Sequence, residues 1–226
     1  MKALNLFPLT VAQDNINIDE KQRDLLINEI TKMQSVHNNQ SPYAWTGDTK
    51  GYEFLFEIKL FKNLANKISA SIIKYLQLLE INTNLLDIYY QRSWATYTKN
   101  EQNINFHTHS QSNISFAYYL LKPKDSGGII FRSNELQNEI AKNIFTNSKL
   151  EKSLINKPNA YNSDRSIFDL EQDSIIIFPS KTPHATMPNK SGQVRISISG
   201  DITIMLKNSK GFEHLMPAFS NWTKFN

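Results

Sequence analysis

The sequence contains no cysteine among its 226 residues. Disulfides, thiolate metal sites, iron–sulfur clusters and cysteine nucleophiles are therefore excluded, and only histidines and carboxylates remain to hold a metal ion. The sequence also lacks any run of eighteen apolar residues, and its first residues lack the apolar core of a secretory signal. We expect a protein of the cytoplasm with no membrane partner.

Charge is sparse and evenly distributed. The 25 Lys and Arg residues and 21 Asp and Glu residues give a net charge of +4, and no five or six like charges follow one another. Nothing in this pattern argues for nucleic-acid binding. The length and an apolar content of 40% suit one domain with a sizeable core.

Helical periodicity is confined to the first third of the chain. Apolar residues recur at helical spacing from about Glu20 to Ser35, where Asp19 is the expected cap, and again from about Glu57 to Leu79. A short strand is expected over Leu6–Val11. We therefore expect residues 1–82 to form a helical support for the rest of the chain.

After residue 82 the sequence changes to short runs of β-branched and aromatic residues separated by turns, which indicates antiparallel strands in a barrel or jelly roll. The strands are expected near residues 86–97, 104–109, 112–120, 129–131, 174–178 and 194–199. A single domain over residues 1–226 would then have a β core at 83–206 and a tail at 207–226. The polar stretch 134–168 is either a lid or disordered.

Two histidines, His107 and His109, stand one residue apart in a segment expected to be extended, so both rings point to the same side. The pair alone is equally compatible with a polar strand face. His184 favours a metal site, because it follows an apolar strand and so lies where that strand ends at a barrel mouth. Three protein ligands are typical of first-row metals with open positions. His37, in a loop, and His214, in the tail, are assigned no ligand role.

Arg195 lies in a strand whose alternate residues are apolar. Arg195, Ser197 and Ser199 therefore share one face, which points either to solvent or into the barrel. A guanidinium with a hydroxyl two residues further on can clamp a carboxylate through bidentate hydrogen bonds.

Together these segments resemble the iron(II)- and 2-oxoglutarate-dependent oxygenases. More narrowly, they resemble a group of bacterial and phage oxygenases distantly similar to prolyl 4-hydroxylases. The matching motifs run almost end to end: Leu6-Phe7-Pro8, Trp94 and Tyr97, His107-Thr108-His109, Ser115 to Leu120, Gly127 to Phe131, Phe178-Pro179-Ser180 with Pro183-His184, and Arg195 to Ser199. Several motifs in the right order are more specific than any one of them.

The resemblance implies a mainly β fold, a double-stranded β-helix of the jelly-roll or cupin-like type, with the N-terminal helices packed on the outer sheet. It implies a dioxygenase that uses Fe(II), 2-oxoglutarate and O2 and hydroxylates a small molecule or a protein side chain, such as a peptidyl proline, with release of succinate and CO2. The implied site residues are, for iron and catalysis, His107, His109 and His184, and, for 2-oxoglutarate, Arg195, Ser197, Tyr97 and Tyr119.

Position 109 departs from the usual pattern of the superfamily, which is His-x-Asp or His-x-Glu. A histidine there, which also occurs in the narrower group, removes one negative charge from the metal's ligands. Either His109 is a genuine third ligand, or the third ligand is different or absent, and zinc also accepts three histidines. Two other classes therefore stay open: a three-histidine cupin-like metalloenzyme that does not use 2-oxoglutarate, and a non-catalytic barrel-type interaction module. The first strand and the apolar tail are candidate surfaces for a homodimer.

Overall fold

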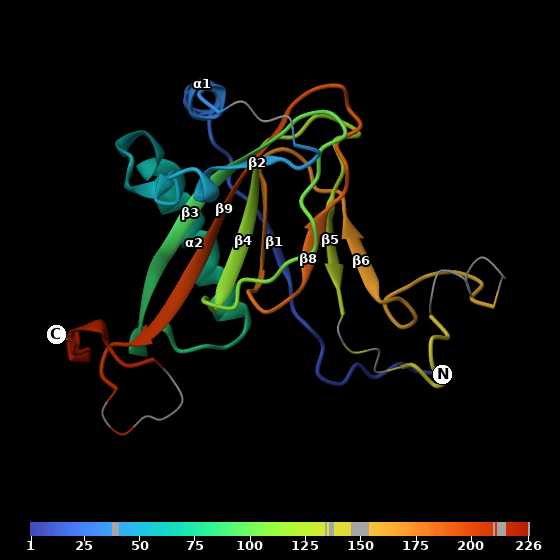
Figure 1. Cartoon of the computed structure of the whole chain (residues 1–226). Coiled ribbons are helices and arrows are strands. Elements are labelled where there is room, and N and C mark those ends of the chain that lie inside the picture. Colours follow the sequence, from blue (N-terminus) through green and yellow to red (C-terminus); the bar gives the residue numbers. More distant parts are fainter. Residues whose placement is uncertain are drawn as a thin grey trace.

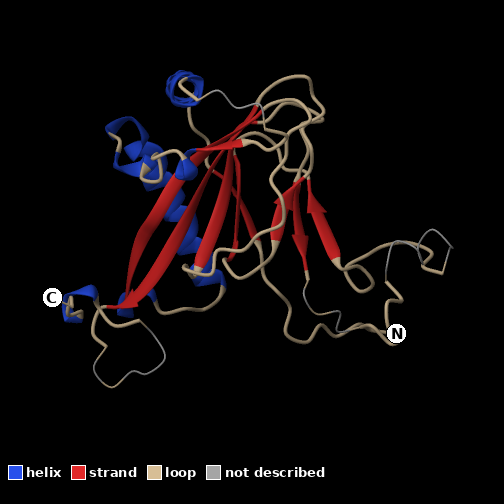
Figure 2. Ribbon diagram, viewed as in Figure 1, coloured by secondary structure: helices blue, strands red, loops and turns tan. Residues whose placement is uncertain are grey.

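A computed structural model of the chain describes residues 1–37, 41–133, 135, 138–145, 154–209, 211 and 216–225. Two antiparallel sheets stand opposite each other, and the two long helices lie on the far side of the larger one (Figure 1). Figure 2 shows strands at the centre of the molecule, with helices along one side and loops connecting them. The mainly β class with flanking N-terminal helices is therefore confirmed.

Within the described part of the chain, the larger sheet has six strands and the smaller one three. In spatial order the larger sheet contains β1 (Ala12–Asn15), β7 (Ser174–Pro179), β4 (Ile114–Leu121), β9 (Arg195–Leu206), β3 (Leu86–Thr98) and β2 (Trp45–Thr46). The smaller sheet contains β6 (Arg165–Phe168), β5 (Ile129–Arg132) and β8 (His184–Thr186). Neighbours in both sheets are antiparallel.

The helices follow from capping and apolar spacing. Helix α1 (Glu20–Ser35) begins where expected, because the Asp19 carboxylate accepts a hydrogen bond from the Gln22 amide at 2.8 Å. Helix α2 (Lys62–Leu78) begins later than expected, since η2 (Leu55–Glu57) and η3 (Lys59–Phe61) form 3-10 turns before it. The remaining 3-10 turns are η1 (Gly47–Thr49), η4 (Thr83–Leu85) and η5 (Phe219–Asn221).

Alternation along the strands divides the apolar side chains between two cores. One face of the larger sheet packs against the helices, with Ile196 and Ile198 of β9 meeting Ile68 of α2 in a single buried cluster. The opposite face, here called the inner face, looks toward the smaller sheet, where Tyr119 and Phe178 pack with Phe131. Neighbouring residues of one strand thus belong to different cores, as Tyr118 and Tyr119 of β4 do.

The expected strand at Leu6–Val11 is not formed, and β1 begins at Ala12 instead. Pro8 has no N–H to donate to a ladder, and Phe7 turns the chain with a positive φ of 56°. The sequence patterns also missed β2 and β8, and they missed β6, which lies within the polar stretch 134–168. Part of that stretch lies outside the described residues, so the lid remains a prediction.

No helix among the residues described is long and apolar enough to cross a membrane.

Candidate metal centre

The expected extended segment around the histidine pair is tied by its backbone to β8 rather than forming a regular strand. His107 and His184 exchange two backbone N–H···O hydrogen bonds of 3.0 Å. On either side, the Thr186 amide donates to the Ile104 carbonyl and the His109 amide to the Ser180 carbonyl, both at 3.0 Å. These four bonds bring His184 beside the His107–His109 pair, although more than seventy positions separate them in the chain.

The three histidines form a single cluster. Their candidate ligand nitrogens all lie within 4.8 Å of one another. Two nitrogens bound to one ion at about 2.1 Å can stand at most about 4.2 Å apart, so the spacing of this cluster is close to what a single ion requires. The structure thus brings all three predicted ligands into a metal-sized group.

Each ring is anchored through Nδ1. His107 Nδ1 lies 2.8 Å from the Asn105 carbonyl oxygen and His184 Nδ1 lies 2.9 Å from the Thr182 carbonyl oxygen. Because a carbonyl only accepts, these Nδ1 atoms carry the hydrogen and leave the Nε2 lone pairs free. Burial, followed by the neighbouring His107, lowers the pKa of His184 to about 3, so this ring is neutral as a ligand must be.

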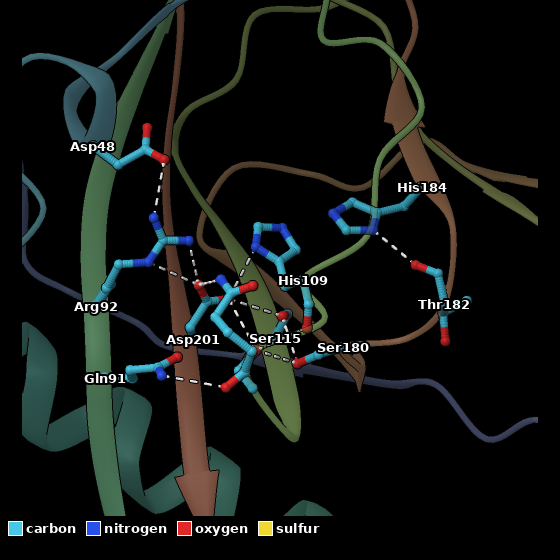
Figure 3. A network of polar contacts seen from close by, with 11 residues as sticks. Asp48, Gln91, Arg92, His109, Ser115, Ser180, Thr182, His184 and Asp201 are labelled. Atoms are coloured by element: carbon cyan, nitrogen blue, oxygen red, sulfur yellow. Dashed lines mark hydrogen bonds and ion pairs between the residues drawn. The ribbon is translucent and has the colours of Figure 1, made fainter.

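His109 is anchored differently, by a carboxylate. Its Nδ1 lies 3.1 Å from Asp201 Oδ1, and the Asp201 side chain is fully buried (Figure 3). Arg92 on β3 donates to Asp201 Oδ2 at 2.7 and 3.2 Å from the other side. Burial by itself raises the pKa of Asp201, but hydrogen bonds and charge from His109 and Arg92 lower it to about 2. Asp201 therefore stands behind His109 as a carboxylate.

Arg195 and Asp201 occupy the two ends of one row on the inner face of β9. The row runs through Ser197 and Ser199, because alternate residues of a strand share a face. Register places Tyr119 opposite Ser197 on one side and Thr96 opposite it on the other. Of the two directions open to Arg195, solvent or the barrel, the structure shows the inward one.

Arg195 is 1% exposed, and its guanidinium is held by acceptors from two segments of the chain. Nη1 donates to the carbonyls of Ser126 at 2.5 Å and Gly127 at 3.1 Å, and Nη2 donates to Thr186 Oγ1 at 3.0 Å. No carboxylate among the described residues pairs with this cation. Burial lowers the pKa of Arg195, and Tyr119 opposes that shift.

Two buried hydroxyls beside Arg195 also lack partners. Thr98 is paired with Arg195 across the β3–β9 ladder, and Ser126 supplies one of its carbonyls; both residues are 0% exposed. Neither Thr98 Oγ1 nor Ser126 Oγ has a hydrogen-bond partner in the described structure. Buried polar atoms are rarely left unsatisfied without a reason. Beside these two hydroxyls lies a guanidinium that has no carboxylate partner among the described residues, and this combination fits an anionic ligand.

The structure separates the two tyrosines that were expected to line one pocket. Tyr119 lies on the inner face, fully buried, and burial raises its pKa to about 12 while Arg195 lowers it. Tyr97 lies on the opposite face, packed against the helical core. The reason is that side chains along a strand alternate between its two faces. Thr96 and Thr98 of β3 lie on the same face as the Arg195 row, so Tyr97, between them, lies on the other face. Tyr97 is therefore not part of this site.

Sequence reasoning missed two participants, Asp201 and Thr186. The signal for Asp201 was present, since the polar alternation of Arg195, Ser197 and Ser199 continues to it. Its partnership with Arg92 depends on the β3–β9 register and carries no local signal. Thr186 was hidden because a three-residue strand after Pro183 gives no periodicity.

The donor set fits a first-row metal ion. Three imidazoles bring their ligand nitrogens within 4.8 Å of one another, and a metal ion held by these three would keep further coordination positions open. The Arg195 guanidinium and the hydroxyls of Thr98 and Ser126 fit a carboxylate that lies beside the metal position. Thr186 follows His184 by two residues on β8, a rise of about 7 Å, which suits a short dicarboxylate spanning both.

Residues 92–201 match the sequence profile of the family described as "Putative 2OG-Fe(II) oxygenase". This match confirms the resemblance drawn from the motifs. No curated protein matches the chain.

Solved structures of 2-oxoglutarate oxygenases share the fold. HygX from Streptomyces hygroscopicus, with nickel and 2-oxoglutarate bound, is 9% identical with a TM-score of 0.55, over 86% of this chain and 83% of that one. A viral collagen prolyl hydroxylase from Paramecium bursaria Chlorella virus-1, in a 2-oxoglutarate complex, is 14% identical with a TM-score of 0.51, over 85% and 94%. A Pseudomonas putida prolyl-4-hydroxylase is 12% identical with a TM-score of 0.52, over 86% and 93%. The double-stranded β-helix is thereby confirmed.

Proposed function

Since this chain carries the sequence pattern of the 2OG-Fe(II) oxygenases over residues 92–201, we propose that it is an iron(II)- and 2-oxoglutarate-dependent dioxygenase that hydroxylates its substrate. The observation that carries the proposal is the cluster of three histidines whose ligand nitrogens lie within 4.8 Å of one another, next to the buried guanidinium of Arg195. Arg195 donates a hydrogen bond to Thr186, which follows His184 by two residues on β8. Iron with 2-oxoglutarate and O2 supplies the oxidising chemistry, in which 2-oxoglutarate becomes succinate and CO2.

The residues of this chain bind and orient the reactants. His107, His109 and His184 would hold the iron, and the other coordination positions stay open. Arg195 would pair with the far carboxylate of 2-oxoglutarate, with Ser197 beside it on the same face. The protein contributes to the reaction rate by placing the substrate, because the reacting hydrogen must be held within a few ångströms of the metal centre.

Aromatic rings pack beside His184 and would shield that side of the metal position from water. Phe178 packs edge-on against His184 with ring centroids 4.7 Å apart, and Phe131 packs edge-on against Phe178 at 4.9 Å. Excluding water strengthens the attraction between Arg195 and a bound carboxylate, because that attraction grows as the local dielectric falls.

We propose a protein side chain as the substrate, with a peptidyl proline as the specific candidate. The support is that two prolyl hydroxylases share the fold over more than nine tenths of their own lengths. A HygX structure with hygromycin B bound is equally similar, so a small-molecule substrate is the alternative to test. This part of the proposal rests on likeness of fold.

The proposal is tested by a thermal-shift titration with 2-oxoglutarate in the presence of Fe(II) without oxygen, followed by a succinate assay in air. A ligand that binds only the folded state raises the Tm. We expect a 2-oxoglutarate shift that depends on the metal, and succinate formation. Metal binding without a 2-oxoglutarate shift would instead identify a three-histidine metalloenzyme of another kind. Absence of any metal after purification without a His-tag would indicate a non-catalytic module.

A further inference from the structure

Position 109 has no carboxylate, but a carboxylate lies behind it. One side chain, His109, separates that carboxylate from the position of the metal. In the superfamily's usual pattern an Asp or Glu would bind the ion directly, whereas here His109 takes that place. Asp201 lies directly behind it, with Oδ1 3.1 Å from His109 Nδ1. Asp201 is 0% exposed and sits on the far side of the ring from the cluster, so it cannot itself replace His109 as a ligand.

Asp201 is held in a complete set of hydrogen bonds. Oδ2 accepts from Arg92 Nε and Nη2 and from Gln111 Nε2 at 3.0 Å, while Oδ1 accepts from Ser115 at 3.1 Å and Ser112 at 3.3 Å. Burying a carboxylate costs several kcal/mol unless partners compensate it, and here donors from β3, β4 and the loop before β4 do so. So many donors fix both the position and the charge of the carboxylate.

His109 is the only one of the three clustered histidines whose anchor carries a charge. His107 and His184 donate to neutral backbone carbonyls. A carboxylate on Nδ1 selects the tautomer with the hydrogen on Nδ1, directs the Nε2 lone pair toward the metal position and makes the imidazole a stronger donor.

Arg92 and Trp94 complete the support of this ring. The Arg92 guanidinium lies 5.1 Å from the centre of the Trp94 ring, and Trp94 lies 5.6 Å from the His109 ring at 31°. Arg92 therefore touches both groups that contact His109. A further ion pair to Asp48, 3.6 Å away, holds Arg92 itself (Figure 3).

We infer that Asp201, held by Arg92, is a positioning residue for the metal, and that through His109 it supplies the negative charge that a directly bound carboxylate supplies in the usual pattern. This rests on the proposed function only in requiring a metal ion at the three histidines. It does not require 2-oxoglutarate turnover.

The test is the affinity of the metal-free protein for Co(II), measured by the visible absorbance of the bound ion, in wild type, Asp201→Asn and Asp173→Asn. Asp173 is the matched control: it pairs with an arginine, Arg23, and accepts from Tyr118 Oη at 2.5 Å, but it belongs to the turn before β7. Loss of a carboxylate behind a metal-bound histidine typically weakens affinity about 10–100-fold. We expect that loss in Asp201→Asn and unchanged affinity in Asp173→Asn.

Equal Co(II) affinity in wild type and a folded Asp201→Asn variant would overturn the inference while leaving the proposed function standing. A wild-type protein that binds no Co(II) would overturn both. If Asp201→Asn does not fold, long-range proton–nitrogen NMR of the metal-free wild type can be used to determine the tautomer of His109. The inference requires the hydrogen of His109 to be on Nδ1. A hydrogen on Nε2 would contradict it.

Discussion

Arg195 Nη2 donates a hydrogen bond of 3.0 Å to the hydroxyl of Thr186, two residues after His184 on β8. The Thr186 hydroxyl also accepts from the Ile104 amide, in the segment that leads to His107. One side chain thus links the buried cation to both chain segments that carry the histidines. The separation between cation and metal position is fixed by backbone structure before any ligand binds.

Arg195→Met should abolish 2-oxoglutarate binding and retain metal binding. Methionine fills much of the same volume but cannot pair with a carboxylate, and Lys would be a poor substitute because it lacks the planar fork. Wild type at a ligand concentration of about 100 Kd should gain about 2.7 kcal/mol of stability, which the variant should lose. The measurement is a thermal-shift titration; a normal 2-oxoglutarate shift in the variant would refute the role given to Arg195.

His184→Ala should lower metal affinity severely, because it removes one of three ligands and the ring that contacts the other two, with centroids 4.3 Å from His107 and 5.2 Å from His109. His37→Ala is the control, since His37 contacts Trp45 and Tyr52 away from the cluster. Metal content after dialysis, measured by atomic emission, reports the effect. Stoichiometric metal in His184→Ala would place the ion elsewhere.

His109→Asp should not behave as a return to the usual superfamily pattern. The new carboxylate would share a buried site with Asp201, and two carboxylates in one site cannot both ionise without cost. We expect metal affinity at least about tenfold below wild type. Adding Asp201→Asn removes the second charge, so the double variant should bind metal better than His109→Asp alone. Weaker metal binding by the double variant than by His109→Asp would contradict the argument that two neighbouring carboxylates repel each other in this site.

Gly200→Ala should destabilise the fold by about 1–3 kcal/mol through overpacking. A Cβ at this position of β9 would lie 2.6 Å from Phe116 Cε1 and 3.0 Å from the Arg92 carbonyl oxygen. Urea unfolding should show a lower midpoint with an unchanged slope. Ser199→Ala, the neighbouring control, should cost less than about 1 kcal/mol, because it adds no atoms. Equal stability of the two variants would argue against the close approach of Phe116.

Local patterns predicted what depends on local physics. Asp19 caps α1 as expected, because capping needs only the first turn. The alternation around Arg195 correctly placed Arg195, Ser197 and Ser199 on one face, but it left open whether that face points to solvent or into the barrel. The spacing of His107 and His109 predicted a shared side because both belong to one extended segment.

What the sequence could not predict depends on register between distant strands. Asp201 meets Arg92 only because β9 and β3 pair in one alignment. Tyr97 was expected in the pocket by resemblance to the oxygenases, but a one-residue difference in phase puts it on the other face. The support for a metal ligand is thus less visible in a sequence than the ligand itself.

The most direct test of the central claim is a crystal structure of the protein soaked with nickel and 2-oxoglutarate, with anomalous diffraction at the nickel edge. The account predicts one anomalous peak bonded to Nε2 of His107, His109 and His184, and 2-oxoglutarate reaching from that ion to Arg195. A peak bonded to fewer than three of these nitrogens, or a ligand carboxylate paired with another residue in place of Arg195, would contradict it.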